Sequence, residues 1–293
     1  MTRPTGSPSS SSIVIAWGGC TSSLPLFCTK LYLLSSVSTN VEKNGLEHRS
    51  RERKIGLWIA GISGFFFFSF FAAPLILPEG TVVDINGRAN TFDFASKDGS
   101  NSYGNSPQGS LHEHADGTLH QHDHFSWSEL DPYTGFIYAF ADLNCHQNHE
   151  RSWVIGGNQM PVCTRDVGIF FGLMMGGILF SRRSYNRWTV RDTCLSLLPD
   201  EWLVNVYVKN RRTLAWLACG IVLCVPLIID GFTQLLTGYE SNNFTRPLTG
   251  APFGLGLAIL IGASIGARAE KFEHASDVVL PGNARFQLKT EEE

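Results

Sequence analysis

Residues 55–77 read IGLWIAGISGFFFFSFFAAPLIL, a run of 23 residues without a charge. At about 1.5 Å of rise per residue, a helix of this length extends roughly 34 Å, which is enough to cross a hydrocarbon core of about 30 Å. A buried helix of a soluble protein is the alternative, but the length of the run and its lack of a polar face count against it. The sequence therefore predicts a transmembrane helix over residues 55–77.

Three more segments are nearly free of charge, and polar residues crowd into the intervals between them. They cover residues 167–180, 213–229 and 251–267, so each needs flanking residues to complete a crossing, with arginines reaching toward the lipid head groups. This distribution predicts an all-α membrane protein, a bundle of about four transmembrane helices in a lipid bilayer with a long extracytoplasmic loop. The net charge of -3 argues against a nucleic-acid partner, because phosphate backbones are bound by concentrated basic faces.

The orientation of the spans is predicted from lysine and arginine, which are retained on the cytoplasmic side of short connections. Four basic residues directly precede the first span, seven lie in residues 181–212, and only Arg246 lies in residues 231–250. Both termini are therefore expected in the cytoplasm. The predicted parts are a disordered cytoplasmic segment over 1–54, the first helix, an extracytoplasmic His-rich loop over 78–140, a membrane domain with three further helices over 141–267, and a cytoplasmic tail over 268–293.

Small residues recur every four positions in the second and fourth predicted spans. They are Gly168, Gly172 and Gly176 in the second span and Gly250, Gly254, Ala258, Gly262 and Gly266 in the fourth. Such a stripe lies along one face of a helix and lets another backbone approach closely. We expect both stripes to contact other helices, which makes a homo-oligomer one of the expected partners. The alternative is that glycine is simply frequent in membrane helices.

Five histidines alternate with other residues in the predicted extracytoplasmic loop. They are His112, His114, His120, His122 and His124. In an extended chain, alternate imidazoles project to one side and can reach the same zinc, copper or nickel ion, so a weak metal site is one interpretation. The other is a solvated loop whose composition has drifted, because glycine, serine and asparagine dominate residues 98–109.

A second set of polar residues lies near the predicted outer ends of the spans. It begins with Cys145-His146-Gln147, continues with Arg151-Ser152, and reaches Pro161-Val162-Cys163-Thr164-Arg165 directly before the first glycine stripe. Asp230, Gln234 and Arg246 lie downstream, at the outer end of the third span and in the hairpin that follows. An ionisable residue at a span boundary favours a partner, and Arg151, Arg165 or Arg246 can each pair with Asp230.

These motifs, from Ala141 onward, together resemble the domain-of-unknown-function 2085 family of uncharacterised prokaryotic membrane proteins. The resemblance covers roughly the C-terminal half and implies a small multi-span protein of the prokaryotic plasma membrane with no assigned activity. The family pattern commonly has a second cysteine after the arginine, as Cys-x-Arg-Cys, whereas Asp166 occupies that position here. This departure puts dithiol chemistry based on that pair in doubt, and the His-rich loop is not part of the resemblance.

The leading functional hypothesis is an extracytoplasmic metal site built from Cys145, His146, Cys163 and Asp166. Thiolate, imidazole and carboxylate ligands suit zinc or another divalent transition metal. A structural disulfide between Cys145 and Cys163, with a transport or partner-binding role for the protein, is an alternative. A membrane thiol oxidoreductase that uses the same two cysteines is another, and it requires a reactive thiolate and a resolving partner. The sequence leaves these alternatives open.

Overall fold

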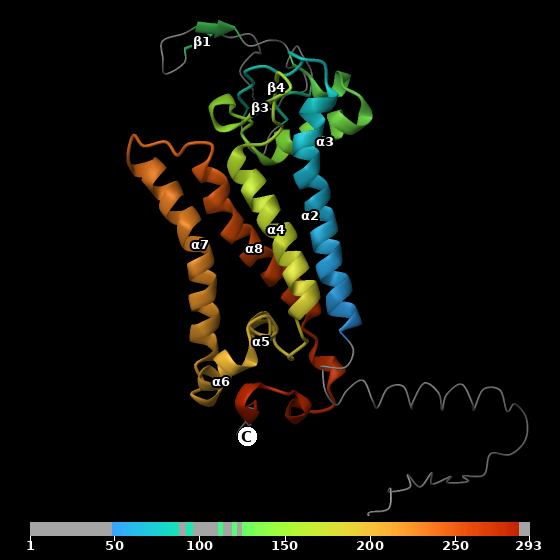
Figure 1. The fold of residues 1–293 in the computed structure, drawn as a ribbon, viewed down its shortest axis with the longest axis vertical. Helices are drawn as coiled ribbons and strands as arrows, with labels where there is room; N and C mark the ends of the chain where they lie inside the picture. Colours follow the sequence, from blue (N-terminus) through green and yellow to red (C-terminus); the bar gives the residue numbers. More distant parts are fainter. Residues whose placement is uncertain (1–48, 88–91, 96–110, 114–118, 122–124, 287–293) are drawn as a thin grey trace, which may run out of the picture. The chain divides into compact units, whose positions relative to one another are not determined.

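The structure is a computed structural model, and it describes residues 49–87, 92–95, 111–113, 119–121 and 125–286. The chain divides into two units, Met1–Asn40 and Val41–Glu293, and every described residue belongs to the second. The predicted disordered segment therefore lies outside the described residues, apart from its last six positions. Figure 1 shows the helices of the second unit coloured along the sequence.

Within the described residues, four helices are long and apolar enough to cross a membrane. They are α2 (Ser50–Ile76), α4 (Thr164–Arg183), α7 (Arg212–Leu236) and α8 (Thr245–Gly266). The predicted all-α membrane bundle is thus confirmed, and each helix begins before the charge-free run from which it was predicted. In particular, α2 begins at Ser50, so residues 50–54 are helical and were wrongly placed in the disordered segment.

The arginines that precede and begin α2 explain this extension. The Arg49 guanidinium donates from Nε to the carbonyl oxygen of Ser184 at 2.8 Å, just beyond the end of α4. Arg51 donates from Nη2 to the carbonyl oxygen of Ile265 at 2.6 Å, at the end of α8. The last carbonyls of a helix have no partner within it, and a cation there also interacts favourably with the helix dipole. The basic start of α2 therefore joins three helices at one end of the bundle.

The two glycine stripes pack against each other. A Cβ atom added to Gly172 would overlap the carbonyl oxygen of Ala251, and one added to Gly254 would overlap that of Ile169. The stripe contacts run along α4 and α8, so the prediction that both stripes contact other helices is confirmed. They are occupied inside one chain, however, so the surface on which a homo-oligomer was expected is already buried. The physical reason is that backbones this close leave no room for a third helix.

Helix α7 has a different environment from the other three spans. Only Arg212 and Asp230 are buried along it, whereas large apolar side chains such as Leu217, Ile221 and Phe232 are exposed. Its surface therefore suits contact with lipid acyl chains. Pro226 lies inside the continuous helix.

The segment predicted as a long loop is partly folded. It contains helix α3 (Pro132–Asn144) and the 3-10 helix η1 (Trp127–Glu129), and is followed by η2 (His149–Arg151) and the antiparallel strands β3 (Val154–Ile155) and β4 (Asn158–Gln159). Asp131 caps α3 by accepting from the backbone N–H groups of Tyr133 and Thr134. We call the described part of residues 78–163 the outer cap, after the side of the membrane that the sequence predicts for it. Its core contains Val82, Ile85, Phe94, Phe125, Ile137, Tyr138, Met160 and Val162, and Phe70 of α2 belongs to the same cluster.

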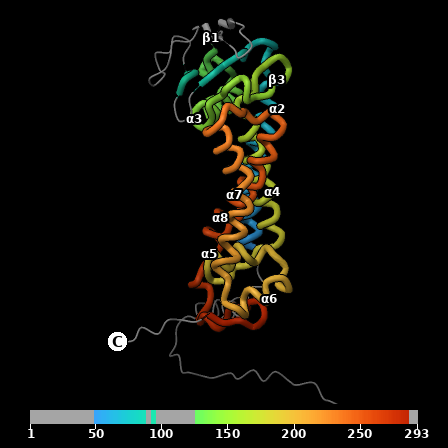
Figure 2. Tube along the Cα trace, turned by 90° about the vertical axis from the view of Figure 1, so that its left-hand side faces the viewer, coloured from blue at the N-terminus to red at the C-terminus, as the bar shows by residue number. Residues whose placement is uncertain are grey.

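The opposite end of the bundle is also folded. Helices α5 (Val190–Leu195) and α6 (Asp200–Val208) pack with the 3-10 helices η3 (Ala269–Lys271), η4 (Ala275–Asp277) and η5 (Pro281–Asn283). Leu195, Leu203, Tyr207, Phe272, Val278 and Leu280 form a small core there. The predicted tail is therefore packed as far as Phe286, because its apolar residues contact those of α5 and α6. In Figure 2 the long helices run between this end and the outer cap.

We predict that Gly172→Val destabilises the protein strongly, while Gly220→Val does not. The added side chain at Gly172 meets the α8 backbone, and overpacking of this kind costs about 3 kcal/mol or more because backbone atoms must move. A Cβ at Gly220 in α7 meets nothing within 4 Å. Unfolding of the purified variants in detergent measures the difference, and equal stability of the two variants would show that the α4–α8 contact is not tight.

Candidate metal centre

Two cysteines that are 18 residues apart in the chain meet where α3 ends and α4 begins. Cys145 is the C-terminal cap of α3, where its backbone N–H donates to the carbonyl oxygen of Ala141 at 2.7 Å. Cys163 is the N-terminal cap of α4, and its backbone N–H donates to Cys145 Sγ at 3.2 Å. Both cysteines are free thiols in the structure, so the disulfide left open by the sequence is not formed in it.

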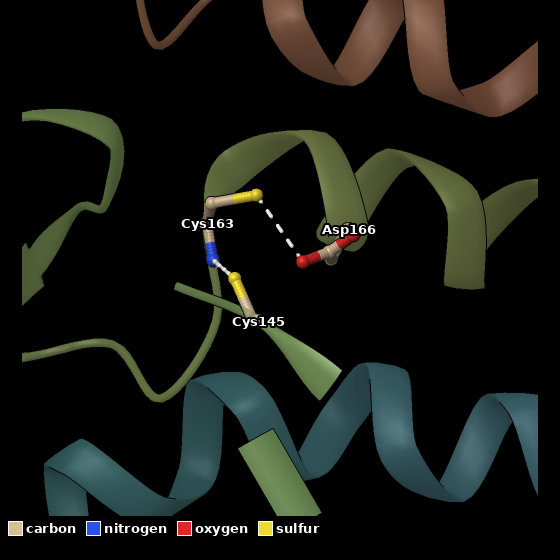
Figure 3. A group of neighbouring side chains, drawn as sticks. All are labelled: Cys145, Cys163 and Asp166. Carbon is tan, nitrogen blue, oxygen red and sulfur yellow. Dashed lines mark hydrogen bonds between the residues drawn. The ribbon is translucent and has the colours of Figure 1, made fainter. Parts of the chain in front are cut away.

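Asp166 completes the cluster from the first turn of α4. The Cys163 thiol donates to Asp166 Oδ2 at 3.2 Å, and the three ligand atoms of Cys145, Cys163 and Asp166 lie within 4.8 Å of one another. Figure 3 shows the two sulfur atoms and the carboxylate around the start of α4. The exposed N–H groups of a helix's first turn favour negative charge, so this location suits thiolate and carboxylate ligands.

The segment after Cys145 is held by buried amide groups. Gln147 has a left-handed backbone with φ of 45°, and its Nε2 donates to the carbonyl oxygen of Pro161 at 3.0 Å. Gln159 Nε2 donates in turn to the carbonyl oxygen of Gln147 at 2.7 Å. These bonds fix the chain reversal that brings Cys145 to Cys163. The Oε1 atom of Gln147 is buried and has no hydrogen-bond partner among the described residues.

The surroundings of Cys145 disfavour its thiolate. Hydrogen bonding with Cys163, burial of the side chain, and the proximity of Cys163 and Asp166 raise the pKa of Cys145 well above its usual value. The thiol is therefore protonated in the neutral pH range in the absence of a bound cation. A divalent cation would reverse this preference, because it pairs with the negative charge that burial otherwise penalises.

His146 lies outside this group of ligands. It is exposed, whereas Cys145 and Gln147 on either side of it are buried. The group of possible ligand atoms that lie within 4.8 Å of one another contains Cys145, Cys163 and Asp166, but not the imidazole of His146. The sequence-based set of Cys145, His146, Cys163 and Asp166 therefore contains one residue that the fold does not bring to the others.

The structure pairs the remaining polar residues at the cysteine end of the bundle. Arg165 forms the ion pair with Asp230 that the sequence left open among three arginines, and Arg151 pairs instead with Glu240 at 2.8 Å. Ser241 Oγ and Thr249 Oγ1 lie 3.4 Å from the same Asp230 oxygen. The Asp230 side chain is 8% exposed, so these partners replace most of its contact with water.

Gln234 and Arg246 extend the same network. Gln234 Nε2 donates to Ser241 Oγ at 2.9 Å, while Arg246 donates from Nε to the carbonyl oxygen of Ser241 at 2.7 Å and from Nη2 to Gln234 Oε1 at 3.3 Å. The adjoining Asn243 side chain donates to the carbonyl oxygens of Glu150 and Ser152. The α7–α8 hairpin is thus fastened to the outer cap beside the cysteine cluster.

Residues 145–260 match the family described as "Predicted membrane protein (DUF2085)". An uncharacterised protein of Methanothermobacter thermautotrophicus is 33% identical over 116 residues, which are 40% of this chain and 82% of that protein. The chain belongs to this family. An uncharacterised protein of Methanocaldococcus jannaschii is 30% identical over 114 residues, which span 39% of this chain and 58% of that protein. No solved structure matches.

The DUF2085 region begins at Cys145 and contains the whole cysteine cluster and the Arg165–Asp230 network. The His-rich loop precedes it. Strands β1 (Leu111–Glu113) and β2 (Leu119–Gln121) pair antiparallel, with His112 opposite His120, while His114, His122 and His124 lie outside the described residues. Metal binding by this loop stays a prediction.

Several residues that position the site were not singled out from the sequence. Asn158 Nδ2 donates to the carbonyl oxygens of Pro74 and Pro78 at 3.0 Å each, joining the cap to the end of α2. The side chain of Gln159 accepts from the backbone N–H of Ile85 and donates to its carbonyl oxygen. The Tyr138 hydroxyl donates to the carbonyl oxygen of Gln159 at 2.7 Å. An Asn-Gln pair after two glycines is the only sequence signal, and it resembles an ordinary turn.

We predict that Asp230→Asn destabilises this DUF2085 protein by about 3 kcal/mol, because it leaves Arg165 without its charged partner in a poorly hydrated place. Glu240→Gln is the matched control, since its pair with Arg151 is 36% and 54% exposed and such pairs contribute about 1 kcal/mol or less. The free energies of unfolding of the two variants and of Arg165→Gln/Asp230→Asn test this. The coupling would be contradicted if the double variant lost as much free energy of unfolding as the sum of the losses of its two single changes.

Proposed function

We propose that this DUF2085 protein binds a divalent transition metal ion through Cys145, Cys163 and Asp166 on the extracytoplasmic side of the membrane. The observation that carries the proposal is the convergence of two sulfur atoms and a carboxylate oxygen within 4.8 Å, from the end of one helix and the start of another. Donors around one zinc ion with bonds of about 2.3 Å are separated by roughly 3.7 Å in a tetrahedral arrangement. The observed spacing suits such an ion after small side-chain adjustments.

Zinc is the metal that this donor set favours. Two thiolates and a carboxylate leave a fourth tetrahedral position for water or an external ligand, and soft sulfur donors select against magnesium and calcium. Because the ion must displace the thiol protons, its affinity rises with pH. This sign follows from the direction of the Cys145 pKa shift.

The same electrostatics weigh against the thiol oxidoreductase. A nucleophilic cysteine needs a thiolate, whereas the pKa of Cys145 is raised rather than lowered. The position of the family's second cysteine is held by Asp166, which accepts a hydrogen bond from Cys163 and offers no sulfur for exchange. In a metal site the Asp166 carboxylate is itself a ligand. The residue that departs from the family pattern therefore has a direct role in the proposed site.

The distribution of basic residues supports the proposed side of the membrane. The end of the bundle opposite the cysteines carries Arg49, Arg51, Arg53, Lys54, Arg182, Arg183, Arg187, Arg191, Lys209, Arg211, Arg212, Arg268, Lys271 and Arg285. Among the described residues, the cysteine end carries Arg151, Arg165 and Arg246. Retention of lysine and arginine in the cytoplasm therefore favours an extracytoplasmic cysteine cluster and a cytoplasmic location for the packed tail.

We expect the purified, reduced protein to bind one zinc or cadmium ion per chain with an affinity that falls between pH 7.5 and pH 5.5. Cys145→Ser and Cys163→Ser should each abolish stoichiometric binding, and Asp166→Asn should weaken it. Cys219→Ser is the matched control because this free cysteine is exposed in α7, and His146→Ala should also retain the ion. Cadmium titration followed by thiolate-to-metal absorbance measures stoichiometry and ligand type.

Negligible metal in the reduced wild-type protein, or equal binding by Cys163→Ser, would overturn the metal site. Mass spectrometry of protein prepared without reductant distinguishes the remaining alternatives. A stable Cys145–Cys163 crosslink that reductant alone removes would support the structural disulfide, and a crosslink that forms and breaks with membrane electron donors would support the oxidoreductase.

The side of the membrane is tested separately by labelling of intact cells. We expect a cysteine introduced by His146→Cys to react with an impermeant maleimide from outside, because this position is exposed at the cysteine end. A cysteine introduced by Lys209→Cys, exposed at the other end, should react only after permeabilisation. The reverse pattern would place the cluster in the cytoplasm, whether or not it binds metal.

A further inference from the structure

Three arginines come together at the end of the bundle opposite the cysteines, in the segment that runs from the end of α4 to the first residue of α7. Arg187 precedes α5, Arg191 lies in α5, and Arg212 is the first residue of α7. The side chain of Arg187 is 3% exposed and that of Arg212 is 10% exposed. Figure 1 shows α5, α6 and the start of α7 gathered in this region. We call these three residues the arginine cluster.

The carboxylates around the arginine cluster do not balance its charge. Asp192 is fully buried and accepts from the Tyr207 hydroxyl at 2.8 Å and from Arg191 Nη2 at 3.2 Å, while Arg212 Nη1 is 3.9 Å away. Asp200 accepts from Arg187 Nη2 at 2.6 Å and 2.9 Å through its two oxygens. Three guanidinium groups therefore face two carboxylates, which leaves one positive charge without a counterion in this contact set.

Four buried donor atoms of the arginine cluster also lack acceptors. They are Arg187 Nη1, Arg191 Nε, Arg212 Nε and Arg212 Nη1, none of which has a hydrogen-bond partner among the described residues. A buried N–H group without an acceptor costs about 1–3 kcal/mol, so several in one place are unusual in a native fold. A group that carries several acceptor oxygens would satisfy them together.

The start of α7 adds a further donor surface. Arg211 caps this 25-residue helix without a side-chain hydrogen bond, so the first backbone N–H groups of the helix have no side-chain cap. Arg191 Nη1 donates to Thr213 Oγ1 at 2.7 Å, which places the arginine cluster at this first turn. The backbone N–H groups at the start of a helix and the helix dipole both favour an anion at such a position.

From the unpaired donors, the excess positive charge and the open helix start, we propose that the arginine cluster binds a phosphate group. Arginine is suited to this group because its planar fork donates two hydrogen bonds to phosphate oxygens. The Arg191 side chain is 28% exposed, so the arginine cluster reaches the protein surface there. The first turn of a membrane span lies at the height of lipid head groups, so an anionic lipid and a soluble phosphate both offer the required chemistry.

The test uses the full-length protein and two probes. Inorganic phosphate is titrated into protein in a neutral detergent, and the protein is separately reconstituted into nanodiscs of phosphatidylcholine alone or with added phosphatidylglycerol. Thermal unfolding reports stabilisation, and native mass spectrometry counts retained phosphatidylglycerol. Arg191→Gln removes a partly exposed member of the cluster and spares the buried Arg187 and Arg212. Arg182→Gln is the control, because it removes the same charge from an exposed position at the end of α4.

Whichever probe binds should stabilise the wild-type protein and the Arg182→Gln variant equally. Arg191→Gln should need roughly tenfold more of it for the same shift, as loss of one charge-assisted contact predicts. Stabilisation by phosphatidylglycerol alone identifies a lipid ligand, and stabilisation by inorganic phosphate in detergent identifies a soluble one. Equal responses of Arg191→Gln and Arg182→Gln to both probes would overturn the proposal. The metal site at the other end is unaffected by either result.

Discussion

The close contact between α4 and α8 determines where the functional groups lie. Gly172 and Gly254 allow backbone atoms of the two helices to touch, which no side chain larger than hydrogen would permit without displacement. In a bilayer, packing of this kind replaces the hydrophobic effect as the force that joins helices, since lipid tails are as apolar as the helix surfaces. The contact continues to the start of both helices, where Gly168 meets Pro247 and Gly250 meets Arg165. The start of α4, with Cys163 as its cap and Asp166 in its first turn, therefore lies beside the start of α8, which carries Arg246.

The pairing of polar groups at the cysteine end of the bundle follows from the contact between α4 and α8. The Arg165–Asp230 pair joins α4 to α7, and Ser241 and Thr249 supply further hydrogen bonds. Without the pair, α7 would depend on few side chains, since Asp230 and Arg212 are its two buried residues. Both ends of the least buried span are therefore held by ionic contacts, and these lie where the bilayer is polar enough to tolerate a charge.

In the cysteine cluster, hydrogen bonds fix the positions of the donor groups, while the proximity of these groups disfavours their negatively charged forms. Gln147 and Gln159 fix the turn that places Cys145 against Cys163, so the donors converge without help from a ligand. At the same time, two thiols and a carboxylate in a partly buried place cannot all carry negative charge, as the raised pKa of Cys145 shows. A preorganised donor set whose charged form needs a cation is the physical basis of the proposed metal site. The arginine cluster presents the opposite case, with buried donors and positive charge that need an anion.

The sequence by itself determined the membrane class, the four spans, the small-residue faces and the family, because long charge-free runs and four-residue spacing are local properties that hydrocarbon thickness and helix geometry translate directly into structure. It also identified Cys145, Cys163, Asp166, Arg165 and Asp230 as residues of interest. Only the tertiary structure decided that the two glycine stripes contact each other, that Arg165 pairs with Asp230 while Arg151 pairs with Glu240, and that His146 is exposed and outside the cysteine cluster. Those outcomes depend on the approach of segments up to 89 residues apart, as for Arg151 and Glu240, and on the direction in which each side chain leaves the backbone. The spacing of residues in the sequence gives neither the approach of distant segments nor the direction of a side chain.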